Sequence, residues 1–102
     1  MVKHIVMWKL KSKTDAADIK TRLEALAGKI PGLLKIEAGI DFLESEQSAD
    51  LVLCVELENK QALEVYRSHP EHQAIVPVIK AAAISRTVID YEKPGVCRTD
   101  DE

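Results

Sequence analysis

The sequence is poor in cysteine: only Cys54 and Cys97 occur among its 102 residues. Cys54 lies inside an apolar, strand-like run, whereas Cys97 lies in a polar C-terminal segment, and neither position suggests that the two pair. Structural disulfides belong mainly to secreted proteins, while cytoplasmic proteins keep their thiols reduced. We therefore interpret both residues as reduced thiols and predict a cytoplasmic protein.

Long apolar runs and an excess of positive charge are also missing. No apolar run approaches the roughly 20 residues that a membrane-spanning helix requires. The apolar stretch Val2–Leu10 is interrupted by Lys3, His4 and Lys9, and no cleavage site follows it, so it does not resemble a secretory signal. With a net charge of −3 and interleaved acids and bases, the chain lacks the concentrated basic face of a nucleic-acid-binding protein. We predict no membrane partner and no nucleic-acid partner.

Familiar catalytic and cofactor motifs are absent as well. The sequence contains no Gly-rich phosphate loop, no Cys-x-x-Cys and no Ser-His-Asp arrangement. Acid–base chemistry near neutral pH would depend on the three histidines, His4, His69 and His72, because imidazole has the ordinary pKa closest to that range. Tyr66 belongs to the same short segment as two of them, in the pattern Tyr66-x-x-His-Pro-x-His72.

What the sequence has in abundance is regular apolar patterning, and the first segment shows it most clearly. Residues 2–11 alternate as a strand does, with successive side chains on opposite faces. One face carries Val2, His4, Val6, Trp8 and Leu10. The opposite face carries Ile5 and Met7, which a strand with one face in water would not need. We therefore expect something to cover each side of this strand.

The remaining segments read as alternating helices and strands. Thr14 or Asp15 is expected to cap the first helix. Asn59 is expected to cap the second, and Pro77 to bend the third helical segment. The predicted elements are a helix from residue 16 to Ile30, ended by Pro31-Gly32; strands over 34–42 and 50–57; a helix over 60–67; a helix from Pro70 to about Ala83; and a strand over 84–91.

This order is β-α-β-β-α-β, which predicts an α+β protein with the ferredoxin-like plan: a four-stranded antiparallel sheet with its helices on one face. We expect one domain over residues 1–92, followed by a polar C-terminal tail over residues 93–102. Helices on one face leave the other face bare. The surplus apolar side chains there predict a homodimer that forms through the two sheet faces.

Each candidate site residue has a structural interpretation beside the functional one. His4 and Tyr66 are equally compatible with core positions, and Trp8, which shares the face of His4, either lines a ligand pocket or fills the core. His69 precedes Pro70 and is placed either to cap a helix or to contact a ligand. Three imidazoles suit a metal site, but Pro70 breaks their spacing and no carboxylate is fixed near by, so we predict no metal.

Several segments, taken in order, resemble the stress-responsive A/B barrel (Dabb) domain family. They are Lys3-His4-Ile5-Val6, Ile30-Pro31-Gly32, Tyr66-x-x-His69-Pro70-x-His72 and Val88-Ile89-Asp90-Tyr91, and the similarity extends over residues 2–91. The resemblance implies the dimeric α+β barrel. Some plant members of that family are polyketide cyclases that need no metal or organic cofactor and close their substrate by an aldol-type condensation. Their site residues correspond to His4, Tyr66 and His72.

Three functional hypotheses follow. The first is a cofactor-free cyclase or lyase that acts on a small, enolisable, hydrophobic carbonyl compound. In it His72 is the general base, His4 orients or shares the proton, Tyr66 donates to the enolate oxygen, and Trp8 and His69 contact the ligand. The second is a non-enzymatic protein that dimerises or binds a small ligand. The third is a cofactor-free monooxygenase, since related barrels include such enzymes.

Overall fold

The structure is a computed structural model that describes residues 1–94. Cys97 and most of the segment 93–102 therefore lie outside the described residues. Four strands form one antiparallel sheet in the order β2-β3-β1-β4. They are β1 (Val2–Leu10), β2 (Leu33–Ile40), β3 (Leu51–Leu57) and β4 (Ala83–Glu92). The predicted α+β, ferredoxin-like arrangement is confirmed.

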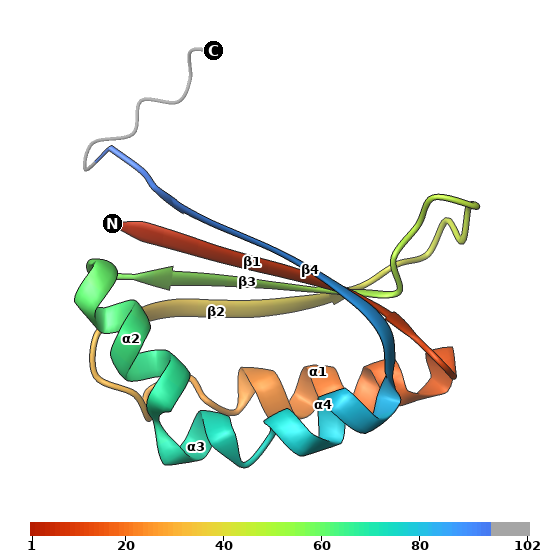
Figure 1. The fold of residues 1–102 in the computed structure, drawn as a ribbon, viewed down its shortest axis with the longest axis horizontal. Helices are drawn as coiled ribbons and strands as arrows, with labels where there is room; N and C mark the ends of the chain where they lie inside the picture. Colours follow the sequence, from red (N-terminus) through yellow and green to blue (C-terminus); the bar gives the residue numbers. More distant parts are fainter. Residues whose placement is uncertain (95–102) are drawn as a thin grey trace.

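The helices pack together on one side of this sheet, which gives a molecule of two layers (Figure 1). They are the 3-10 helix η1 (Lys13–Asp15) and the α-helices α1 (Ala16–Glu24), α2 (Lys60–Ser68), α3 (Pro70–Gln73) and α4 (Val76–Ala82). No helix in residues 1–94 is both long and apolar enough to cross a membrane.

Strand β1 lies in the middle of the sheet, between β3 and β4, and its alternation decides where the core is. The five residues predicted to share one face, Val2, His4, Val6, Trp8 and Leu10, are all buried beneath the helices. They pack with apolar residues of β3 and with the inner faces of α1 and α2. Tyr66 on α2 is the largest fully buried side chain, so one of the candidate catalytic residues is also a centrepiece of the core.

The first helix differs from its prediction at both ends. Neither Thr14 nor Asp15 caps it: Thr14 Oγ1 bonds to Ser12 Oγ instead, and Asp15 makes no side-chain capping bond. Helix α1 ends at Glu24, and turns lead on to Gly28, which has φ +79°. Ile30 is nevertheless buried, because the turns after the helix keep its apolar side against the sheet.

The helix predicted over residues 70–83 is two helices, α3 and α4, separated at Ala74–Ile75. Pro77 lies in the first turn of α4, where a residue without a backbone N–H is tolerated. In the middle of a continuous helix the same proline would have removed a hydrogen bond, so the chain breaks rather than bends. The cap predicted for α2 is confirmed: Asn59 Oδ1 accepts from the Ala62 N–H at 2.8 Å.

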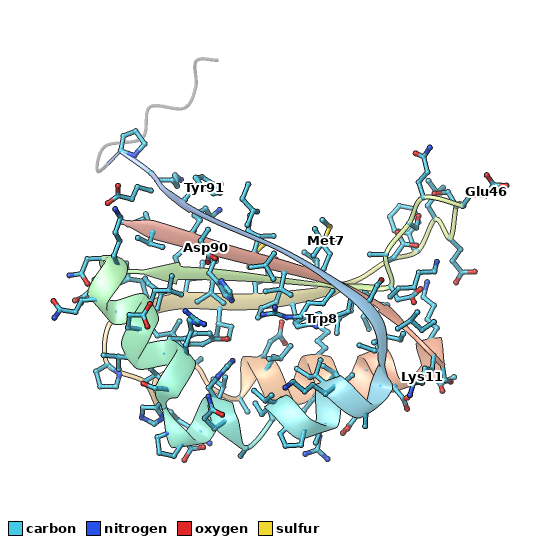
Figure 2. The ribbon with its side chains drawn as sticks, viewed as in Figure 1. Met7, Trp8, Lys11, Glu46, Asp90 and Tyr91 are labelled. Atoms are coloured by element: carbon cyan, nitrogen blue, oxygen red, sulfur yellow. The ribbon has the colours of Figure 1, made fainter. Side chains whose placement is uncertain are left out.

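The sheet face away from the helices is uncovered in residues 1–94 (Figure 2). Strand pairing places Ile5 between Cys54 and Ile89 on this face, and Met7 opposite Val52. Met7 is 41% exposed and Ile89 57% exposed, with Tyr91 projecting on the same side. This bare face is an apolar patch at the centre of the sheet, bordered by charged residues such as Lys3.

Two glycines with positive φ provide a matched test of how α2 is seated. At Gly32 (φ +81°) an added Cβ would lie 2.7 Å from the Ala62 Cβ, whereas at Gly28 (φ +79°) it would meet nothing within 4 Å. We expect Gly28→Ala to lower the free energy of unfolding by about 1 kcal/mol through backbone strain alone. Gly32→Ala should lower it by about 2–3 kcal/mol, because α2 must also move. Urea unfolding measures both, and equal losses would contradict the close approach of Ala62.

Candidate functional site

The pairing of β1 with β4 places His4 directly opposite Asp90. His4 is 5% exposed, and its Nδ1 lies 2.5 Å from Oδ1 of Asp90. Asp90 belongs to β4, an edge strand of the sheet. A carboxylate bound to Nδ1 holds the hydrogen there and orients the ring, which leaves Nε2 as the free nitrogen. The pair therefore presents an oriented imidazole inside the core.

Tyr66 lies between the two candidate imidazoles, His4 and His72. Its ring centroid is 5.8 Å from that of His4, in an edge-on arrangement, and 4.6 Å from that of His72. The hydroxyl is buried and has no hydrogen-bond partner among residues 1–94. Burial raises the pKa of the phenol, although the nearby charge of Arg86 acts in the opposite direction. Tyr66 therefore remains protonated near neutral pH and keeps an unused donor.

His72 is partly buried on α3, and its Nδ1 lies 3.2 Å from the carbonyl oxygen of Arg67. Because a carbonyl only accepts, Nδ1 carries the hydrogen and Nε2 carries the lone pair in the neutral ring. Burial lowers the pKa of His72; the hydrogen bond to the Arg67 carbonyl opposes this shift, while the positive charges of the Arg86 and Arg67 side chains add to it. Since α3 has only four residues, burial rather than a helix dipole is the main reason why this imidazole stays neutral.

His69 has a structural contact of its own. Its Nδ1 accepts from the Glu71 N–H at 3.1 Å and caps α3, directly before Pro70. It does not border the cleft described next, so the structure does not bring it to the same place as His72. Within residues 1–94, no three His, Cys, Asp or Glu side chains gather as a possible metal-binding set.

A cleft of about 440 Å³ lies between α4 and the β1–β4 pair, a size typical of small-molecule sites. Trp8 and His72 line it, but His4 and Tyr66 do not. Of the four side chains expected to line one pocket, the cleft therefore brings together only these two. The Trp8 Nε1 is buried without a hydrogen-bond partner in the described part of the chain. The lining residues are Trp8, His72, Val76, Ile79, Lys80, Ala83, Ile84, Ser85 and Arg86.

Sequence reasoning missed two residues of this region. Asp90 was noticed as part of a motif, but it has no role until the register of β1 and β4 is known. The same register places Arg86 opposite Trp8 and thus beside the cleft. Once His4 is known to pair with Asp90, the antiparallel register also places Arg86 opposite Trp8, because residues four apart on one strand share a face.

The sequence matches the family described as the Stress Responsive A/B Barrel Domain, Dabb, over residues 2–93. A comparison with curated proteins gave no match. Among solved structures, a dimeric protein of unknown function and ferredoxin-like fold from Bacteroides fragilis is 33% identical. It has a TM-score of 0.81, and the match covers 90% of this chain and 95% of that one.

Two more distant structures show the same fold. A Dabb family protein from Mesorhizobium loti is 19% identical with a TM-score of 0.74, and the match covers 92% of this chain and 97% of that one. The hydroxynitrile lyase of Passiflora edulis is 14% identical with a TM-score of 0.78, covering 95% and 96%. At such identities the likeness concerns the fold alone. The family match, which spans nearly every described residue, establishes that the chain belongs to the stress-responsive A/B barrel (Dabb) domain family.

Proposed function

We propose that this protein is a cofactor-free enzyme of the lyase or cyclase class that removes a proton from the carbon beside the carbonyl group of a small compound. The observation that carries the proposal is the state of His72 at the edge of the cleft. Its Nδ1–H is engaged by the Arg67 carbonyl, so its Nε2 is the basic nitrogen. A neutral, positioned imidazole is the group that such a proton abstraction requires near pH 7.

Tyr66 is suited to stabilise the charge that forms when the proton leaves. Its ring is adjacent to that of His72, and its hydroxyl is a buried donor without a partner among the described residues. An enolate oxygen that accepts from this hydroxyl would be stabilised in surroundings from which water is excluded. The nearby Arg86 would favour the same negative charge.

His4 and Asp90 complete the proposed arrangement from the other side of the phenol. The carboxylate holds His4 Nδ1, and the His4 ring faces Tyr66 edge-on. In this proposal the oriented imidazole accepts or returns a proton as the enolate forms and collapses. Because His4 and Tyr66 lie behind the cleft lining, the side chains around His72 must shift for a substrate to meet all three.

That same burial favours a second candidate function, a non-enzymatic protein that binds a small ligand in the cleft. His4 and Tyr66 are both explained as core residues if nothing reaches them, since the His4–Asp90 pair satisfies the imidazole and the apolar core surrounds the phenol ring. The cleft would then act through Trp8 and His72 without proton transfer.

We further propose that two copies associate through the bare sheet face. Ile5 and Met7 lie at its centre, and Ile89 is more than half exposed in the single chain. A contiguous apolar face of this kind is typical of an interface between copies. The Bacteroides fragilis structure, which is described as dimeric, supports the proposal.

The dimer is tested by placing a charge on the bare face. We expect the wild-type protein to sediment as a dimer at micromolar concentrations. Ile89→Glu should weaken association by about 100-fold or more, because it buries an unpaired carboxylate in an apolar interface. Val65→Glu is the control, since Val65 is 40% exposed on helix α2, in the other layer. A wild-type protein that sediments as a single chain, or an Ile89→Glu variant that remains dimeric, would contradict the proposed interface.

The protonation state of His72 gives a pH-dependent prediction. Its pKa is lowered from 6.5 in the folded chain, so the unfolded chain binds a proton more readily below that value. This contribution to stability is complete above pH 6.5 and decreases as the pH falls through the folded pKa. We expect the His72 ring to titrate below 6.5 by NMR, and His72→Asn to remove part of the acid-side loss of unfolding free energy. A midpoint at or above the ordinary value would refute a neutral base.

The proposed chemistry is tested in D2O with ethyl 3-oxohexanoate and with the 3-oxohexanoate anion, following by NMR the exchange of the protons on the carbon between the keto carbon and the carboxyl carbon. We expect wild-type protein to accelerate exchange beyond the rate in buffer. His72→Asn should reduce the catalysed rate by about 100-fold or more, and Tyr66→Phe by about 10-fold or more. His69→Asn, which retains a capping side chain on α3, is the matched control and should keep the wild-type rate. No acceleration by the wild type, or an equal rate in His72→Asn, would favour the ligand-binding candidate.

A further inference from the structure

The charged side chains that line the cleft are all cationic. Lys80 reaches it from α4 and Arg86 from β4, while no aspartate or glutamate is among the lining residues. Neither cation forms an ion pair with any residue of the described range 1–94. By contrast, Lys13 is paired with Glu44. The cleft therefore has two cations that are available to a ligand.

A buried donor lies in the same cleft. Trp8 is 3% exposed, and its Nε1–H has no hydrogen-bond partner in residues 1–94. Leaving a buried N–H unpaired is unfavourable, so a ligand atom that accepts a hydrogen bond from it removes this penalty on binding. Because Arg86 pairs with Trp8 across β1 and β4, the guanidinium and the indole belong to one face of the sheet. Together they form a donor-rich end.

Apart from His72 and Ser85, the rest of the lining is apolar. Val76 and Ile79 contribute from α4, and Ala83 and Ile84 from the beginning of β4. Ile84 is 64% exposed in the single chain, so its side chain is accessible to a ligand. The cleft thus combines an apolar wall with a cationic, hydrogen-bond-donating end, which is the complement of a molecule with an apolar chain and an anionic head.

We infer that this cleft binds a small carboxylate with an unbranched apolar chain. The carboxylate is held by Arg86 and the Trp8 Nε1–H, Lys80 adds to the positive potential, and the chain lies along Val76, Ile79 and Ile84. A planar guanidinium matches both oxygens of a carboxylate, which an amide or ester of the same length does not reproduce. For the reaction this inference rests on the proposed function, and it then names the substrate class as an oxo-carboxylate whose carbonyl group lies toward His72.

Trp8 is the only tryptophan in the chain, so its fluorescence reports directly on the cleft. The test titrates the full-length protein with hexanoate and with hexanamide, which have the same length but differ in charge. We expect hexanoate to bind about 10-fold or more tightly than hexanamide. Arg86→Gln should reduce hexanoate affinity to that of the amide and leave hexanamide binding unchanged. Arg86→Lys should recover part of the loss.

Lys29→Gln is the control, since Lys29 is exposed and does not line the cleft, and it should leave both affinities unchanged. Equal binding of hexanoate and hexanamide, binding of neither, or an Arg86→Gln variant that keeps the preference would each overturn the inference. A preference for hexanoate in a protein that does not catalyse proton exchange would retain the carboxylate site and reject the proposed chemistry. Exchange catalysis without the preference would do the reverse.

Discussion

The register between β1 and β4 is the constraint on which the rest of the structure depends. It places His4 opposite Asp90, Val6 opposite Val88 and Trp8 opposite Arg86. Because side chains alternate along a strand, a slip of one residue would transfer the whole set of β1 to the other face. The core would then lose its central strand, and both the imidazole–carboxylate pair and the cationic end of the cleft would be lost with it. Fold and candidate site therefore share one determinant.

The candidate site is continuous with the core rather than added to its surface. Tyr66 is fully buried in the core beneath α2, and its ring lies between those of His4 and His72. Its burial keeps the phenol protonated, and the partial burial of His72 lowers the pKa of that imidazole. The same contacts thus set both the packing and the acid–base properties of these residues. Their positions in the core are therefore compatible with an enzymatic role and with a purely structural one.

The two faces of the sheet differ in what covers them. The helix side contains the core, the buried pair and the cleft. The opposite side presents Met7 without cover from the described residues (Figure 2), and strand pairing places Ile5 and Ile89 on the same face. A sheet with apolar groups on both faces, but helices on only one, is incomplete as a single chain. The proposed association of two copies would cover the apolar side chains of the bare face and leave the cleft on the other side unchanged.

Local patterns were sufficient for much of the fold. The period-two alternation of β1 identified its buried face, and Asn59 was recognised as the cap of α2 because its side chain acts on the next few residues. Capping of α1 by Thr14 or Asp15 was expected on the same grounds and is wrong, since Thr14 bonds to Ser12. The break between α3 and α4 was underestimated as a bend at Pro77, because the cost of its missing N–H depends on where the neighbouring turns begin.

By itself, the sequence determined the order of the elements, the buried face of β1 and the Tyr66–His72 segment, because these follow from spacing along one chain. Only the tertiary structure decided that Asp90 binds His4, that Arg86 joins Trp8 at the cleft, and that His69 caps a helix away from it. Such contacts join residues far apart in sequence, and they depend on strand register and helix ends that no local pattern specifies.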